Sequence, residues 1–194
     1  MVHEGQSEPL GATILEGGTN FAVWAPDADR IELCLFTPDG GHWNVDLPGF
    51  TKGVFHGFVP DVGHGQEYGL RVHGPWQPER GLRFNPAKLL VDPYAKAVTG
   101  ELVMDEAIFG HVADDDLTFN AKDSASFVPH SVVVDTSYDW EDDVAPNRPF
   151  NDTVLYETHL ATLSRLHPEV PENIRGTYAG MAHPAIIGHL LDLG

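Results

Sequence analysis

The chain has 194 residues, with 29 acidic side chains against 11 lysines and arginines and a formal net charge of −18. A surface of that sign excludes nucleic acid and anionic lipid as partners, because binding phosphate requires Lys and Arg to displace counterions. Neutral ligands such as polyols remain possible. The length fits one ordinary domain and part of a second, and the 42% of hydrophobic residues supplies a core.

The beginning of the chain, Met1 to Pro9, lacks the positive charge and the apolar run of a signal peptide. No apolar stretch approaches the roughly 20 residues that cross a bilayer, so we expect no membrane partner. The single cysteine, Cys34, lies in an alternating apolar stretch and is expected to be a buried, inert thiol. Together these features predict a cytoplasmic protein.

Apolar and polar residues alternate with period 2 in several short segments, which indicates strands with one buried face. They are separated by turn signals such as Gly17-Gly18 and Pro38-Asp39-Gly40-Gly41. This spacing predicts a mostly β protein with an immunoglobulin-like antiparallel β-sandwich. In it we expect Trp24 to pack in the core. The strands are expected at residues 19–25, 31–35, 43–47, 68–72 and 131–135.

The sandwich is expected to span residues 1–137, with a long irregular insertion at about 74–126 that is rich in Pro, Gly and Asn. Residues 138–150 form an acidic, Pro-containing linker. Beyond it the pattern predicts a strand at 153–160, a loop, and a helix at 183–193. Pro184 suits the first helical turn and Gly194 the C-terminal cap. Strand, loop and helix indicate one βα unit of a larger parallel fold.

Several ordered blocks of sequence resemble one enzyme family. Residues 18–26 (GTNFAVWAP) resemble the opening strand of the glycogen-binding-type sandwich that precedes the barrel in debranching and branching enzymes. Residues 68–76 and 81–95 look like bacterial glycogen debranching enzymes and their isoamylase relatives. Residues 155–159 (LYETH) and 175–180 (RGTYAG) look like the first strand and loop of the α-amylase-superfamily barrel. Residues 161–164 (ATLS) depart from the family, which typically has a basic residue, Gly, an apolar residue and Thr there.

The resemblance implies hydrolysis of α-1,6 branch linkages in glycogen or limit dextrin, by a retaining mechanism with two carboxylates. In the family those carboxylates lie on later barrel strands. Residues 151–194 are therefore expected to be the first strand, loop and helix of an incomplete (β/α)8 barrel. We assign no catalytic residue, cofactor or metal to the chain. It is expected to be a non-catalytic docking or glucan-binding module whose partners are α-glucan and the remaining barrel; the alternative is a stand-alone glucan-binding or interaction module.

Sugar rings stack on exposed aromatic side chains, so Trp43 and Trp76, which lie near turns, are the candidate carbohydrate-binding residues. The alternative is that they face the neighbouring barrel. Glu157 and His159 are interpreted as buried residues that fix the predicted strand. The run Asp114-Asp115-Asp116 is interpreted as a solvated acidic loop. The sequence does not indicate an oligomeric state.

Overall fold

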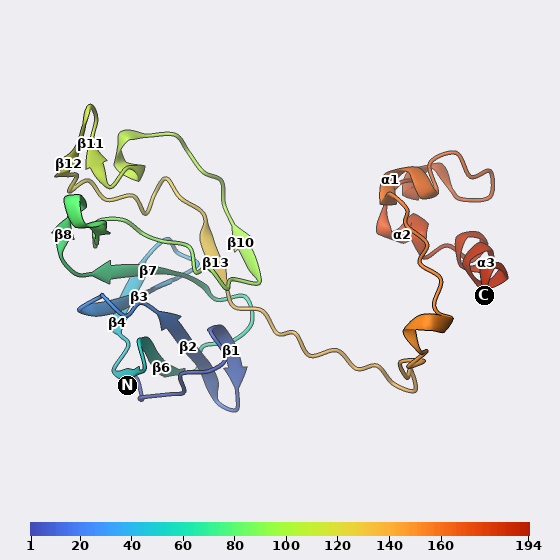
Figure 1. The fold of residues 1–194 in the computed structure, drawn as a ribbon, viewed down its shortest axis with the longest axis horizontal. Coiled ribbons are helices and arrows are strands. Elements are labelled where there is room, and N and C mark those ends of the chain that lie inside the picture. The colour runs from blue at the N-terminus through green and yellow to red at the C-terminus, as the bar shows by residue number, and fades with distance from the viewer. The chain divides into compact units, whose positions relative to one another are not determined.

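The computed structural model describes residues 1–194, which divide into two compact units, Met1–Tyr138 and Asp139–Gly194. The first unit carries all the strands and the second carries the α-helices (Figure 1). Every strand pair in the first unit is antiparallel. The predicted class, mostly β with antiparallel sheets, is confirmed.

Two sheets form the body of the first unit. The four-stranded sheet has the order β1-β2-β6-β5 and the five-stranded sheet has the order β10-β13-β7-β3-β4. The strands of the first sheet are β1 (Gly11–Leu15), β2 (Gly18–Trp24), β5 (Gly49–Thr51) and β6 (Val54–Pro60). Those of the second are β3 (Arg30–Phe36), β4 (His42–Asp46), β7 (Glu67–His73), β10 (Ala97–Thr99) and β13 (His130–Val132).

The core lies between these two sheets, because alternate residues of each strand point inward. Ile31, Leu33 and Leu35 of β3 are fully buried, as the period-2 pattern predicts. The ring of Phe21 on β2 meets the ring of Tyr68 on β7 edge to face, with centroids 5.1 Å apart. Buried residues from both sheets therefore form one cluster, and the structure is an antiparallel β-sandwich.

The prediction that Trp24 packs in the core is wrong. Trp24 is the last residue of β2, opposite Val54 of β6, and its side chain is 63% exposed. Along β2 it alternates out of phase with Phe21, which is buried, so its side chain lies on the face away from the core. At this end of the sheet that face is open to solvent.

The region expected to be an irregular insertion contains short elements. These are β8 (Trp76–Gln77), η1 (Pro78–Arg80), β9 (Leu82–Arg83), η2 (Glu106–Ile108), β11 (His111–Val112) and β12 (Asp115–Phe119). They lie on the side of β7 away from β1, β2 and β6 (Figure 1). We call residues 84–93 and 104–125, on either side of β10, the covering segment, because their contacts with Gly69 and Arg71 cover part of the outer face of the five-stranded sheet.

Contact between sheet and covering segment is close at Gly69. A Cβ at this position would lie 2.5 Å from Cδ1 of Leu89, so only glycine leaves room for the leucine. The neighbouring Cys34, paired with Gly69 across β3 and β7, is fully buried. Burial raises the pKa of its thiol to about 11. The thiol is therefore protonated and buried, as the sequence predicts.

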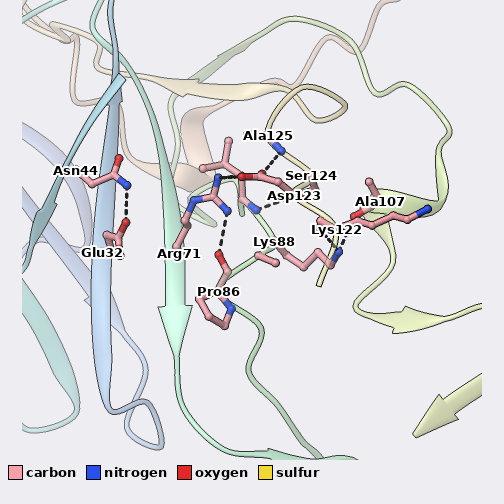
Figure 2. A network of polar contacts seen from close by, with 12 residues as sticks. Glu32, Asn44, Arg71, Pro86, Lys88, Ala107, Lys122, Asp123, Ser124 and Ala125 are labelled. Carbon is pink, nitrogen blue, oxygen red and sulfur yellow. Dashed lines mark hydrogen bonds and ion pairs between the residues drawn. The ribbon is translucent and has the colours of Figure 1, made fainter. Parts of the chain in front are cut away.

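Two buried cations hold the covering segment in place (Figure 2). The guanidinium of Arg71, on β7, donates to the carbonyl oxygen of Pro86 at 2.9 Å and to both carboxylate oxygens of Asp123 at 2.9 and 2.8 Å. The ammonium of Lys88 donates to the carbonyl oxygens of Ala107 and Lys122 at 2.7 and 2.6 Å. Burial lowers the pKa of Lys88. Since these carbonyls lie far apart in sequence, each cation ties remote backbone segments together.

We expect Asp123→Asn to lower the free energy of unfolding by about 1–2 kcal/mol near neutral pH, between the values typical of exposed and of buried ion pairs. Burial raises the pKa of Asp123, but hydrogen bonds from the Ala125 N–H and the Arg71 guanidinium outweigh it, and the pKa is lowered. The ionised Asp123 carboxylate therefore contributes its full stabilisation above the ordinary aspartate pKa of about 3.9. This stabilisation is lost as the pH falls through the lower pKa of the folded state. Denaturant titrations of the wild type and of Asp123→Asn from pH 7 to pH 2.5 measure the difference in their free energies of unfolding. If this difference does not shrink in acid, the stabilisation does not come from the charged Asp123 carboxylate.

The second unit is built from short helices. They are η3 (Phe150–Asp152), α1 (Leu160–Leu163), η4 (Glu172–Ile174), α2 (Tyr178–Met181) and α3 (Pro184–Leu193). Helix α3 has Pro184 in its first turn and Gly194 as its C-cap, which confirms the predicted helix. Val170 and Ile186 are buried, and the buried Ser164 hydroxyl accepts a hydrogen bond from the Gly176 N–H at 2.9 Å.

The strand predicted at 153–160 is absent from this structure. Residues 153–159 form no ladder, and helix α1 begins at Leu160. Val154 and Leu155 are 92% and 82% exposed. A strand exists only as a hydrogen-bonded pair with a neighbour, and here the segment has none. No helix of the chain is both long and apolar enough to cross a membrane.

Candidate functional site

Trp43 lies on β4, at the edge of the five-stranded sheet. It stands directly opposite Leu35 of β3, which is a core residue, so its indole is on the inner face of the sheet. Because β4 is the edge strand, the ring is still 42% exposed. The structure thus places Trp43 at the open rim of the sandwich, within reach of a ligand.

Trp76, on β8, is partly buried and has several internal contacts. Its indole N–H donates to the carbonyl oxygen of Leu117 at 2.7 Å, and its ring meets Phe119 edge to face at 5.2 Å. The guanidinium carbon of Arg83 lies 6.0 Å from the ring centroid. These contacts join β8 and β9 to the hairpin of β11 and β12. Much of the indole is therefore in contact with other residues of the protein.

The structure does not bring Trp43 and Trp76 together. Trp43 pairs with Leu35 of β3, and Leu35 pairs with Tyr68 near the start of β7, so these three residues lie at the same position along the strands. Trp76 follows His73, the last residue of that strand. Five residues of strand separate the two positions, which is about 17 Å at the usual rise of about 3.4 Å.

A third tryptophan lies beside a groove that the sequence did not indicate. The groove has a volume of about 630 Å³ and runs between the end of β2 and the covering segment. Trp24 and Pro26 are among the residues that line it. The apolar part of the lining includes Val23, Leu70, Val72, Leu82, Phe84 and Leu90.

Four side chains that carry charge or an amide also line this groove: Asp27, Arg83, Asn85 and Lys88. The amide nitrogen of Asn85 is bound to the carbonyl oxygens of Gly110 and Asn120, and the Lys88 ammonium is bound to two carbonyls as well. Asp27 and Arg83 are exposed. They are the polar side chains of the groove that solvent reaches.

The remaining candidates from the sequence lie apart from these surfaces. Glu157 and His159 are exposed, so the interpretation that they are buried is wrong; with no strand formed, neither is covered by a neighbour. Asp115 accepts hydrogen bonds from Leu117 and Thr118, and Asp116 accepts from Arg83. These acidic side chains are exposed. The structure contains no cluster of three or more His, Cys, Asp or Glu side chains that could hold a metal ion.

The first unit is similar to a known family of domains. Residues 9–95 match the model of carbohydrate-binding module 48, the isoamylase N-terminal domain. This range contains β1 to β9 and therefore most of both sheets, together with Trp24, Trp43 and Trp76. It also includes three of the five sequence blocks on which the resemblance rests, at 18–26, 68–76 and 81–95.

The chain is 46% identical over 190 residues to the glycogen debranching enzymes of Salmonella typhi and Enterobacter sp. (strain 638). The match covers 98% of this chain and 28% of those enzymes, so the chain spans less than a third of their length. Among solved structures, a pullulanase from Anoxybacillus sp. LM18-11 aligns with a TM-score of 0.58 at 20% identity, covering 92% of this chain and 21% of its own. A maltotriose complex of a PulA mutant from Klebsiella pneumoniae aligns with a TM-score of 0.63 at 20% identity, covering 95% and 19%. At this identity the two structures show the shared fold.

Proposed function

Because residues 9–95 match the model of carbohydrate-binding module 48, the isoamylase N-terminal domain, we propose that this chain is the amino-terminal part of a glycogen debranching enzyme. Its first unit is a non-catalytic module that binds α-glucan. The observation that carries this proposal is the 46% identity to glycogen debranching enzymes across nearly the whole chain. The enzyme as a whole hydrolyses α-1,6 branch linkages of glycogen or limit dextrin.

The electrostatics of the chain suit this ligand. With a net charge of −18, the surface repels anionic polymers, whereas an uncharged polyol such as glycogen meets no long-range repulsion. Solved relatives of the fold include a pullulanase complexed with maltotetraose and a glycogen-degrading virulence factor in a product complex. A cytoplasmic location fits as well, since the single cysteine is a buried, unpaired thiol.

We further propose that residues 151–194 begin the (β/α)8 barrel of the enzyme. The segment 153–160 is rich in β-forming residues, and Val154, Leu155 and Tyr156 are all exposed. Exposed apolar side chains on an extended, unpaired backbone fit a strand that pairs with barrel neighbours. The catalytic carboxylates then lie on later strands of the barrel, and this chain supplies none of them.

Native gel electrophoresis in glycogen tests the binding function at the two tryptophans that the sequence indicated. We expect the chain to be retarded relative to a gel without glycogen. If Trp43 stacks on sugar, Trp43→Ala weakens binding by about 1–3 kcal/mol, as for other aromatic contacts at binding sites. Trp76→Ala is compared in the same gel, with thermal unfolding followed in parallel, because Trp76 also holds the hairpin of β11 and β12. Unretarded wild-type protein would favour a docking role for the module.

A further inference from the structure

We propose that Trp24 and the groove beside it form an α-glucan-binding site of the module. The ligand class rests on the proposed function, whereas the position of the site rests on the structure. No sequence pattern indicated this site, since Trp24 was expected in the core. The occupant is a linear α-1,4-glucan segment that lies across the indole and enters the groove.

Trp24 has the geometry of a stacking platform. Its side chain is 63% exposed although indole is among the largest apolar groups in proteins. The edge of the ring rests on the turn between β5 and β6, where a Cβ at Gly53 would lie 3.3 Å from Nε1 of Trp24 and 3.1 Å from Cβ of Pro26. Gly53 has φ +85°, which other residues rarely adopt. The turn thus supports the indole closely and leaves a large part of the ring for a ligand.

The groove matches a sugar chain in size and in chemistry. Its volume of about 630 Å³ lies within the range of about 300–1,000 Å³ that is usual for ligand sites. A pyranose ring has apolar C–H faces and a rim of hydroxyls. The apolar lining, including Val72 and Leu82, suits the faces, while the exposed carboxylate of Asp27 accepts from hydroxyls and the Arg83 guanidinium donates to them.

The groove is held in shape before any ligand arrives. Arg83 is positioned by Asp116, whose backbone and carboxylate oxygens accept at 2.6 and 3.3 Å. Asn85 and Lys88, which also line the groove, are fixed by hydrogen bonds to carbonyls of the covering segment. A site ordered in advance loses less entropy on binding. Trp24 is also more accessible than Trp76, since it is 63% exposed whereas Trp76 is partly buried and meets the Phe119 ring.

The test compares four proteins in native gels that contain increasing concentrations of glycogen: wild type, Trp24→Ala, Trp24→Phe and Trp140→Ala. Trp140 is the matched control, since it is also 63% exposed and lies in the second unit. We expect Trp24→Ala to weaken glycogen affinity at least tenfold, a change that corresponds to about 1.4 kcal/mol. Trp24→Phe keeps a ring and retains most of the affinity, and Trp140→Ala behaves as wild type.

A second readout uses maltotetraose as a soluble probe. Stacking on Trp24 changes the tryptophan fluorescence of the wild-type chain, and this change is lost in Trp24→Phe. If the wild type binds glycogen and Trp24→Ala binds equally well, the proposed site is wrong. If the wild type itself does not bind glycogen, the proposed function fails as well, so the two failures are distinguishable. Circular dichroism of each variant establishes that it is folded.

Discussion

Replacing Phe21 with alanine is expected to lower the free energy of unfolding of the first unit by about 3–5 kcal/mol. This is the usual cost of removing a buried phenylalanine ring, since the lost transfer energy adds to that of the cavity left behind. Phe21 is 1% exposed and packs edge to face on Tyr68, so the ring joins the two sheets of the sandwich. Urea titration followed by circular dichroism measures the change.

Phe50→Ala is the matched control for this substitution. Phe50 lies on β5 of the same sheet, is 55% exposed and has one ring contact, with Phe55 at 4.7 Å. Its loss should cost about 1 kcal/mol or less. Equal losses for the two variants would mean that the core does not lie between the sheets as described.

Limited proteolysis with subtilisin is expected to cut first between Tyr138 and Pro149, or within residues 166–176, and to leave a resistant fragment of about residues 1–137. The residues from Tyr138 to Pro149 are exposed and contain no helix or strand. The sandwich is protected by its buried core and by the Arg71 and Lys88 contacts. Cleavage of a folded protein requires local opening, which is easiest where few buried contacts must be broken.

Mass spectrometry of the digest over time identifies the order of the cuts. Amide hydrogen exchange gives an independent measurement on the uncut chain. We expect residues after Asn151 to exchange much faster than Val132–Val134, which are in or next to β13. Exchange that is equally slow in both regions would show that the second unit is as stable as the sandwich, contrary to this account.

The parts of the fold that follow from local pattern could be predicted from the sequence. Strands β2, β3, β4 and β7 alternate clearly, because one face of each lies in the core. Helix α3 has its own start and stop signals at Pro184 and Gly194. Strand β6 was missed, because it has apolar residues on both faces. Phe55 and Val59 face the core, while Phe58 lies on the outer face beside His3.

Other features depend on contacts between residues far apart in sequence. Alternation places Trp24 opposite to Phe21, but it cannot show which face of the sheet another segment covers. The covering segment is fixed by side chains that bind remote carbonyls, as Lys88 does at Ala107 and Lys122. Such contacts leave no periodic signal. The candidate strand at 153–160 failed for a related reason, since a strand requires a neighbour that the local sequence does not specify.

The candidate site, too, depends on contacts between residues far apart in sequence, which local patterns do not reveal. Trp43 could be selected from the sequence because it lies close to a Gly-rich turn, and the structure places it at an open rim with 42% of its side chain exposed. Trp76 looked equivalent, yet its contacts with Leu117 and Phe119 are visible only in the fold. The groove beside Trp24 combines residues 23–27 with the segment from 81 to 110, and no local pattern links these two stretches.

That this module binds α-glucan is tested most directly by calorimetric titration of the unmodified 194-residue chain with maltotetraose, with cellotetraose as the control for the linkage. We expect saturable heat with maltotetraose and none with the β-linked sugar, since the proposed ligand is an α-1,4-glucan. The chain should also be retarded by glycogen, and maltotetraose should reverse the retardation. No heat with either sugar, together with unchanged mobility in glycogen, would contradict the carbohydrate-binding function.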